Sequence, residues 1–180
     1  MIDLGLPSGT KWSCCNVGAA KPEAFGGYYA WGETETKSEY SWKTYKHYDG
    51  TDKTYHELGE DIAGTKYDVA HVKWGGSWVM PSKVQQDELR DNCAYTWTTL
   101  NGVRGGRFTS KKNGASIFLP AAGTRWDDDL VDAGSDGNFW SSTQYPSSSN
   151  GAYGLGFDSG GAYWYGYLRL IGRTVRPVSR

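Results

Sequence analysis

The sequence predicts a single domain, residues 1–180, made of short β-strands and long loops with little helix. Glycine supplies 25 of the 180 residues and aromatic side chains 15%, a composition that favours strands and turns. Residues that favour helices run out toward the C-terminus, because no Glu follows Glu88 and no Lys follows Lys112. Large and small side chains alternate from Tyr153 to Asp158, which is the period of a strand with one buried face.

The first half of the chain combines short strands with a long polar segment. Strand character is expected within residues 2–18 and over residues 28–32, where apolar and aromatic side chains gather. Pro22 favours the first turn of a short helix over residues 21–25, and two glycines would end it. Residues 33–73 are polar and show no strong period, so we expect a surface insertion there.

A helix is predicted over residues 83–92. Ser82 is a good N-cap, because its hydroxyl can accept a hydrogen bond from a backbone N–H of the first turn. Val84, Leu89 and Cys93 are expected to form the apolar side of this helix.

Antiparallel strands joined by tight turns are predicted after this helix. Asn101–Gly102 is expected to form one turn. Asn113–Gly114 is expected to form a type I′ hairpin, since Asn and Gly tolerate the positive φ that this turn requires. The predicted strands are residues 95–100, 107–110, 116–120, 137–143 and 173–178.

Charge and hydropathy argue against several classes of partner. The formal net charge is −1 at pH 7, which leaves no basic surface for nucleic acid or an anionic membrane. No apolar run approaches the ~20 residues of a membrane-spanning helix, so direct membrane insertion is not expected. No export signal precedes the predicted domain, and we expect the chain to be a module of a longer displayed protein.

Few residues suggest catalysis or metal binding. Cys14, Cys15 and Cys93 make no disulfide framework, and free thiols are expected, with a bond from Cys93 to one of the other two as the alternative. His56 and His71 lack the spacing of a zinc site. No nucleophile or phosphate-binding motif stands out. We therefore expect no catalysis, no metal and no cofactor.

Six motifs in order carry a resemblance to a known family. They are Trp12 with residues 16–18, then residues 29–33, 75–82, 117–123, 139–143 and 172–178. Together they resemble the bacterial major paralogous domain (Fibrobacter-type) family. That family is allied to the C-type-lectin-like fold of formylglycine-generating enzymes and of variable proteins diversified by retroelements. The resemblance covers nearly the whole chain outside residues 33–73.

The resemblance implies an α+β, C-type-lectin-like fold of twisted antiparallel sheets, with one or two helices and much irregular loop. The N- and C-terminal strands would pair, and residues 137–180 would carry an exposed display region. Formylglycine-generating relatives hold copper with cysteines of the C-terminal half. No Cys follows Cys93 in this chain, so that chemistry is not expected. Arg169, Arg173 and Arg176 would be scaffold residues that bond to backbone carbonyls or acids.

In the retroelement-diversified members, the variable surface precedes the closing Arg-Pro-Val strand. Substitution at the adenines of Asn codons yields Tyr, Ser, Asp, Gly, Ala, Leu, Ile and Arg, but never Lys, Glu, Gln, Met or Trp. Residues 145–171 contain none of those five except Trp164, which would then be a fixed scaffold position. Antibody paratopes favour the same Tyr, Ser, Gly and Asn, because Tyr gives a large contact area at low entropic cost.

The function that follows is non-catalytic recognition by a receptor or adhesin module on a bacterial surface, pilus or phage particle. Its ligand is expected to be a protein or a glycan on another cell or surface. Tyrosines would be the aromatic anchors, Ser, Asn and Asp the adaptable hydrogen-bonding groups, and glycines would set the concavity. The expected binding residues are Tyr145, Ser147, Ser149, Asn150, Gly154, Gly156, Asp158, Gly160, Gly161, Ala162, Tyr163, Tyr165, Tyr167, Leu170 and Ile171.

The strand at residues 153–158 fixes the direction of that surface. Tyr153, Leu155 and Phe157 are expected to be buried, so that residues 154, 156 and 158 face solvent.

Two alternative functions remain open. The first is an undiversified structural module of a paralogous family, whose Tyr and Gly loops only close the fold. The second is a calcium-dependent carbohydrate-binding lectin, for which residues 127–129, Asp132 and Asp136 offer oxygen ligands. The Glu-Pro-Asn, Gln-Pro-Asp and Trp-Asn-Asp motifs of such lectins are missing, which favours a solvated acidic loop instead.

Overall fold

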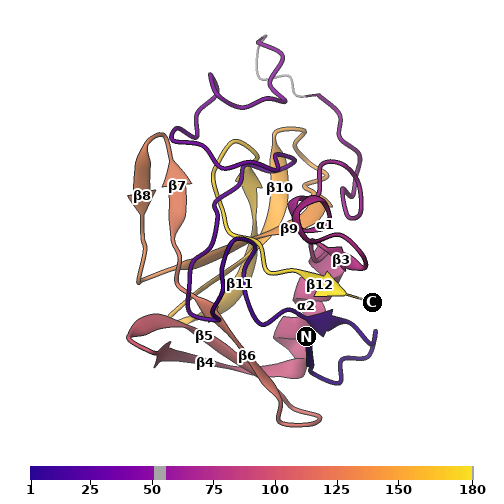
Figure 1. The fold of residues 1–180 in the computed structure, drawn as a ribbon, viewed down its shortest axis with the longest axis vertical. Coiled ribbons are helices and arrows are strands. Elements are labelled where there is room, and N and C mark those ends of the chain that lie inside the picture. The colour runs from indigo at the N-terminus through magenta and orange to yellow at the C-terminus, as the bar shows by residue number, and fades with distance from the viewer. Residues whose placement is uncertain (51–55, 180) are drawn as a thin grey trace.

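The computed structural model describes residues 1–50 and 56–179, and over these residues the protein is mostly β, with small antiparallel sheets and two short helices (Figure 1). The two ends of the chain meet in one sheet, of order β1-β2-β12-β3. Its strands are Ile2–Asp3, Lys11–Trp12, Val178–Ser179 and Trp78–Val79, in that order. The pairing of β12 with β2 joins the two ends of the chain as the resemblance implies.

Three antiparallel strands make the sheet that contains most of the residues predicted to bind a ligand. They are β9 (Gly137–Gln144), β10 (Gly151–Asp158) and β11 (Gly161–Leu168), with β10 in the centre. β11 pairs with β10 and forms the edge of this sheet. The register places Gly154 opposite Tyr165 and Gly156 opposite Tyr163.

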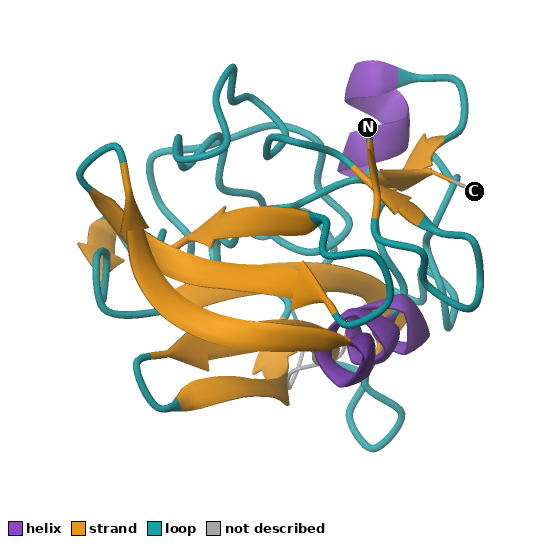
Figure 2. Ribbon diagram, turned by 90° about the horizontal axis from the view of Figure 1, so that it is seen from below, coloured by secondary structure: helices purple, strands orange, loops and turns teal. Residues whose placement is uncertain are grey.

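A second three-stranded sheet is built from β4 (Cys93–Leu100), β5 (Val103–Ser110) and β6 (Ser116–Pro120). It lies below the first sheet in Figure 1 and toward the viewer in Figure 2, which is seen from below. The turn between β4 and β5 is the type I′ turn, since Asn101 and Gly102 both have positive φ. The prediction of that turn at residues 113–114 was wrong. Gly114 N–H donates to Ser110 O in a wider loop, because the Asn113 side chain instead accepts from Ala115 N.

A short hairpin, β7 (Thr124–Trp126) and β8 (Asp129–Val131), stands apart from these two sheets. It is joined to the rest by the bridge of Arg125 to Gly172 and by that of Asp127 to Tyr40. Predicted strands 28–32 and 173–178 are mostly irregular, and they touch through an isolated bridge between Tyr29 and Arg173.

The helix predicted over residues 83–92 is confirmed as α2 (Lys83–Asn92), with Ser82 and Gln85 in a capping box. Its predicted apolar side was wrong at Val84, which is 74% exposed. Gln85 and Gln86 are buried instead, and the Gln86 amide donates to the Trp140 carbonyl of β9. A polar side chain faces the core here because a strand carbonyl satisfies it.

The other helix, α1 (Val69–Trp74), was not predicted, although Asp68 caps it by accepting from the N–H groups of Ala70 and His71. The predicted helix at residues 21–25 is a turn. Among the described residues, no helix combines the length and the apolar character needed to cross a membrane.

Three clusters of buried side chains make up the core. The largest joins Phe139, Leu155 and Phe157 of the β9–β11 sheet to Phe108 of the sheet below. The second is centred on Trp31 and Trp140, and the third on Tyr40 and Tyr45. The expectation of a surface insertion at residues 33–73 therefore fails in part, because this segment buries Tyr40, Tyr45 and Ile62. Residues 51–55 of that segment lie outside the described residues.

Candidate functional site

β11 presents three tyrosines on one face of the edge strand. The ring centroids of Tyr163 and Tyr165 lie 5.1 Å apart, and those of Tyr165 and Tyr167 lie 5.8 Å apart, in edge-on arrangements. Such spacing is within the range that aromatic pairs prefer. We call these three residues the tyrosine ladder. Alternation along the strand sends their side chains the same way, while Trp164 points to the other face.

Glycines of the central strand make room for the ladder. A Cβ at Gly156 would lie 2.3 Å from the Tyr163 ring, and one at Gly154 would lie 2.8 Å from Phe139 O and 3.4 Å from the Tyr167 ring. The expectation that Gly154 and Gly156 face solvent was therefore wrong, since both are buried. They lie on the predicted face of the strand, but the tyrosines of β11 cover them. Leu155 and Phe157 are buried as predicted, whereas Tyr153 is only half-buried.

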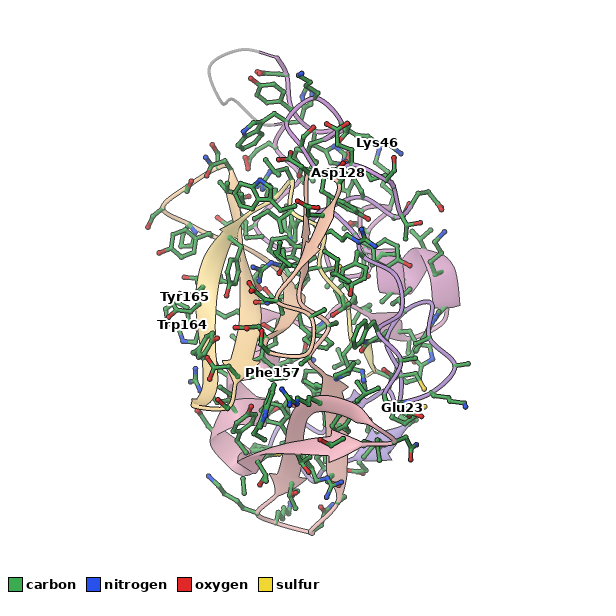
Figure 3. The ribbon with its side chains drawn as sticks, turned by 90° about the vertical axis from the view of Figure 1, so that its left-hand side faces the viewer. Glu23, Lys46, Asp128, Phe157, Trp164 and Tyr165 are labelled. Atoms are coloured by element: carbon green, nitrogen blue, oxygen red, sulfur yellow. The ribbon has the colours of Figure 1, made fainter. Side chains whose placement is uncertain are left out.

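The ladder forms one wall of a groove of about 510 Å³. The opposite wall comes from the β7–β8 hairpin, through Trp126 and Val131, and from the chain that follows it, through Asp132 and Asp136. Trp126 and Tyr165 are 46% and 54% exposed, so large apolar surface faces the solvent here. Figure 3 shows Tyr165 at the outer edge of the sheet and Phe157 at its inner end, toward the sheet of β4–β6.

Arg173 forms part of the groove floor and holds the ladder in place. Its guanidinium carbon lies 3.1 Å from the centroid of the Tyr167 ring, and Nη1 donates to Asn138 Oδ1 at 3.2 Å. Burial lowers the pKa of Arg173 to about 10, so the side chain still carries its charge at neutral pH. Tyr167 is thus fixed between Arg173 and the edge of Trp140, whose centroid is 6.3 Å away.

Asp158 closes the turn between β10 and β11. Its carboxylate accepts from Gly160 N at 2.6 Å and from the Tyr163 hydroxyl at 3.2 Å. Burial, and next the Asp158 charge, raise the pKa of Tyr163 far above its usual value, so its hydroxyl stays protonated and donates. Asp158 therefore positions Tyr163 and is less adaptable than expected.

Several predicted site residues lie away from the groove. Tyr145 packs on the opposite face, over Gly166 and against Tyr153 at 4.9 Å between centroids, so its predicted role on the same surface was wrong. Leu170 and Ile171 were predicted to add apolar contact if exposed, but only 2% and 5% of their surfaces are exposed, because both pack in the cluster around Tyr40. Ile171 reaches only the groove floor.

The remaining predicted residues lie in the turns and on the far face of β11. Ser147 and Ser149 are exposed in the turn between β9 and β10, where Asn150 accepts from Ser148 through its side chain. Gly160 belongs to the turn between β10 and β11, and Gly161 begins β11 opposite Asp158. Ala162 is half-buried against the cluster around Phe157. Of fifteen predicted residues, the structure brings together the three tyrosines, the glycines beneath them and Asp158.

Sequence reasoning missed the wall formed by β7 and β8. Thr124 and Trp126 share the groove-facing side with Val131, because Thr124 pairs with Val131 in register. The alternation of Thr124 and Trp126 is the only local signal, and it spans three residues. It is too short to indicate that the hairpin would stand opposite residues 163–167.

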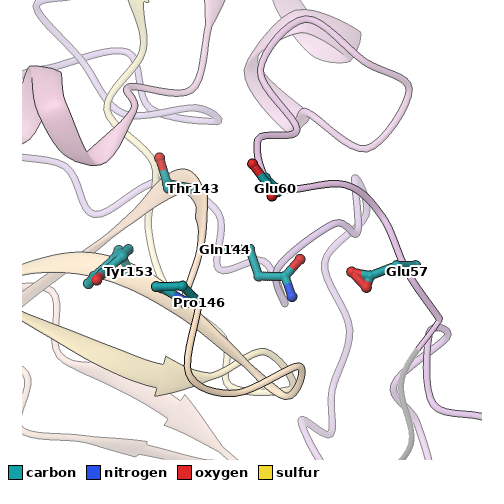
Figure 4. Close-up of a pocket in the computed structure, with 6 residues that line it drawn as sticks. All are labelled: Glu57, Glu60, Thr143, Gln144, Pro146 and Tyr153. Atoms are coloured by element: carbon teal, nitrogen blue, oxygen red, sulfur yellow. The ribbon is translucent and has the colours of Figure 1, made fainter.

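A second pocket, of about 370 Å³, lies between the end of β9 and residues 57–60 (Figure 4). Glu57, Glu60, Gln144 and Tyr153 are among its lining residues. Tyr153 is on the face opposite to the tyrosine ladder, so this pocket is separate from the groove. Gln144 Oε1 is buried there and has no hydrogen-bond partner among the described residues.

The C-terminal arginines act as scaffold, as the resemblance implies. Arg176 is buried and donates five hydrogen bonds, to Asn16 Oδ1 and to the backbone carbonyls of Ser13, Cys14, Pro22 and Phe118. Burial lowers its pKa to about 10. Arg169 donates to His56 O, with its guanidinium 4.5 Å from the Trp31 ring centroid.

Over residues 1–50 and 56–179, no three or more His, Cys, Asp or Glu side chains are grouped in a way that could bind a metal ion. Cys14, Cys15 and Cys93 are free thiols, and burial raises the pKa of Cys93 to about 11.

The chain belongs to a family described as a domain of unknown function (DUF8237), whose model matches residues 83–178. The match runs from the start of α2 to β12 and includes both walls and the floor of the groove. Comparison with curated proteins and with solved structures gave no match.

Proposed function

We propose that this protein is a non-catalytic recognition module, of the receptor or adhesin kind, which binds a ligand in the groove beside the tyrosine ladder. The observation that carries the proposal is the construction of the ladder. Tyr163, Tyr165 and Tyr167 are held in register by glycines beneath them, by Asp158 and by Arg173, yet Tyr165 is 54% exposed. Rigid aromatic anchors around a concave surface give contact area at low entropic cost.

We further propose that the fold is C-type-lectin-like and that the module is displayed on a cell surface or phage particle. Pairing of the chain ends through β2 and β12 supports this fold, as does a mainly antiparallel architecture with α2 against β9 and β10. The most specific version of this proposal is that a retroelement diversifies residues 145–171. It rests on the residue types of the segment and on the resemblance.

A binding screen with the unchanged domain and two variants tests the recognition proposal. Immobilised glycans and bacterial cell-surface proteins are probed with the domain and with the variant Tyr163→Ser/Tyr165→Ser. Trp164→Ser is the matched control, because Trp164 lies on the same strand, is 40% exposed and points to the other face. Loss of binding in the tyrosine variant alone is expected. Equal binding by all three proteins would contradict the proposal.

The genomic neighbourhood tests diversification separately. A near-repeat of the coding DNA, with adenines at the codons of Tyr163 and Tyr165, beside a reverse transcriptase gene, is the expected finding. If the neighbourhood holds neither, the undiversified structural module becomes the better interpretation. That alternative already has support at Tyr145 and Tyr167, whose rings pack against the scaffold.

A further inference from the structure

We propose that the groove selects a cationic group, and specifically an arginine or lysine side chain presented by a protein partner. The inference rests on the proposed recognition function and adds the chemical class of the ligand. It follows from three features of the groove: ring faces that no cation occupies, carboxylates on the facing wall, and a floor arginine that is buried.

The sheet uses aromatic rings as cation sites at both of its faces. Arg173 stacks on Tyr167, with 3.1 Å between the guanidinium carbon and the ring centroid. On the opposite face, Lys83 Nζ lies 4.3 Å from the Trp164 ring centroid and 5.3 Å from that of Tyr153. Cations are attracted to such ring faces by the quadrupole of the π-system.

Tyr163, Tyr165 and Trp126 remain available for a cation from outside. No Lys or Arg of the described residues stacks on any of these three rings. Tyr165 and Trp126 are about half exposed on facing walls of the groove. A guanidinium or ammonium entering between the walls would therefore meet aromatic surface from both sides.

The carboxylates of the facing wall complement such a cation. Asp132 and Asp136 line the groove, and Asp129 lies opposite Trp126 in the β7–β8 register, on the same side of the hairpin. Asp132 and Asp129 are exposed, so solvent screening makes the attraction between each carboxylate and a ligand cation modest. Together, the carboxylates make the electrostatic potential at this wall negative.

The positive charge of the groove floor is buried, and the two lining carboxylates of Asp132 and Asp136 outnumber it. Arg173 is 3% exposed and bonds to Asn138 instead of either carboxylate. Arg125, the cation of β7, donates to Asp128 O and stacks on Tyr28 at 5.6 Å from the ring centroid. Carboxylates and open ring faces are therefore what a ligand meets first, and a polypeptide bearing Arg or Lys satisfies both.

A peptide titration tests the inference. The probe is a short peptide of alternating glycine and arginine, and its neutral isostere has each arginine replaced by citrulline. Binding is measured by calorimetry, and its location by NMR shifts of the amides of β11 and of the β7–β8 hairpin. The arginine peptide is expected to shift both elements, with affinity that falls as salt is added. The citrulline peptide is expected to leave them unchanged.

Charge-removing variants complete the design. Asp132→Asn/Asp136→Asn keeps the shape of the groove, and Asn tolerates the positive φ of Asp132. This variant is expected to weaken the arginine peptide about fivefold or more. Asp91→Asn removes an exposed charge from α2, outside the groove lining, and is expected to change nothing.

The outcomes separate the two proposals. Equal affinity for the citrulline peptide, no shift at β11 with the arginine peptide, or full affinity in Asp132→Asn/Asp136→Asn would each overturn the cationic class. If Tyr163→Ser/Tyr165→Ser still abolished binding of a screened protein or glycan, the recognition function would stand without it. If neither the tyrosine nor the aspartate variant affected any ligand, both proposals would fail.

Discussion

At the residue scale, the ladder tyrosines differ in how much they contribute to stability, and substitution of Tyr165 and Tyr167 should show this difference. Tyr165→Ser should change the free energy of unfolding by about 0.5 kcal/mol or less, because this side chain is 54% exposed. Tyr167→Ser should cost about 2 kcal/mol, since its ring packs on Arg173 and Trp140. Urea unfolding measures both. Equal costs would show that Tyr165 belongs to the scaffold.

Arg176 should be the least replaceable charged residue of the scaffold. Its five hydrogen bonds use all five N–H donors, and three of them reach the carbonyls of Ser13, Cys14 and Phe118. Lysine has three donors and no planar fork, so Arg176→Lys should leave buried carbonyls unsatisfied and cost about 3 kcal/mol. A thermal melt of Arg176→Lys within error of the unchanged protein would refute this account.

At the element scale, β10 accommodates the tyrosine rings of β11 because it carries glycines where those rings lie. Gly156→Ala should push the Tyr163 ring away, break its hydrogen bond to Asp158 and cost about 1–3 kcal/mol. Ser159→Ala, an exposed change in the adjoining turn, is the control and should be neutral. NMR shifts of Tyr163 and chemical unfolding report the two effects. If the Tyr163 ring did not move in Gly156→Ala, the glycine would not be required to make room for that ring.

Local sequence patterns predicted α2 and the buried positions of β10, but they did not predict which side chains from other strands pack on β10. Ser82 marked the start of α2, and alternation marked Leu155 and Phe157 as buried, because caps and period-2 patterns act within a few residues. Gly154 carries no side chain, so its sequence position says nothing about what covers it. Its cover comes from Tyr167 of another strand, and only the register of β10 and β11 decides that.

For the same reason, the sequence predicted the wall of the candidate site that β11 forms, but it did not predict the facing wall. The tyrosines alternate within β11, and their spacing alone places them on one face. The facing wall, with Trp126 and Val131, is more than thirty residues away in sequence and comes from strands of three residues. No period encodes a meeting of that kind. Leu170 and Ile171 were misplaced because apolar side chains beside a surface strand can equally turn inward, as they do toward Tyr40.

At the scale of the whole molecule, the fold should depend on neither metal nor disulfide. Core clusters around Phe157 and Trp140 contain most of the buried aromatic rings, and Cys93 is a buried thiol within the first of them. Thermal melts with and without chelator, and with and without reductant, should coincide. A large drop with chelator would show that the acidic residues beside the groove hold a cation. A drop with reductant would reveal a bond among the cysteines.

The central claim is that the core holds the fold while the groove is free to serve recognition. The most direct test is the fraction of protease-resistant members in two displayed libraries of this domain. One randomises Trp126, Val131, Asp132, Tyr163 and Tyr165. The other randomises the buried residues Phe139, Trp140, Leu155 and Phe157, whose loss costs about 3–5 kcal/mol for each large ring. Most groove variants should resist protease like the parent, and almost no core variant should. If the groove library lost resistance as completely as the core library, its side chains would be structural and the claim would be wrong.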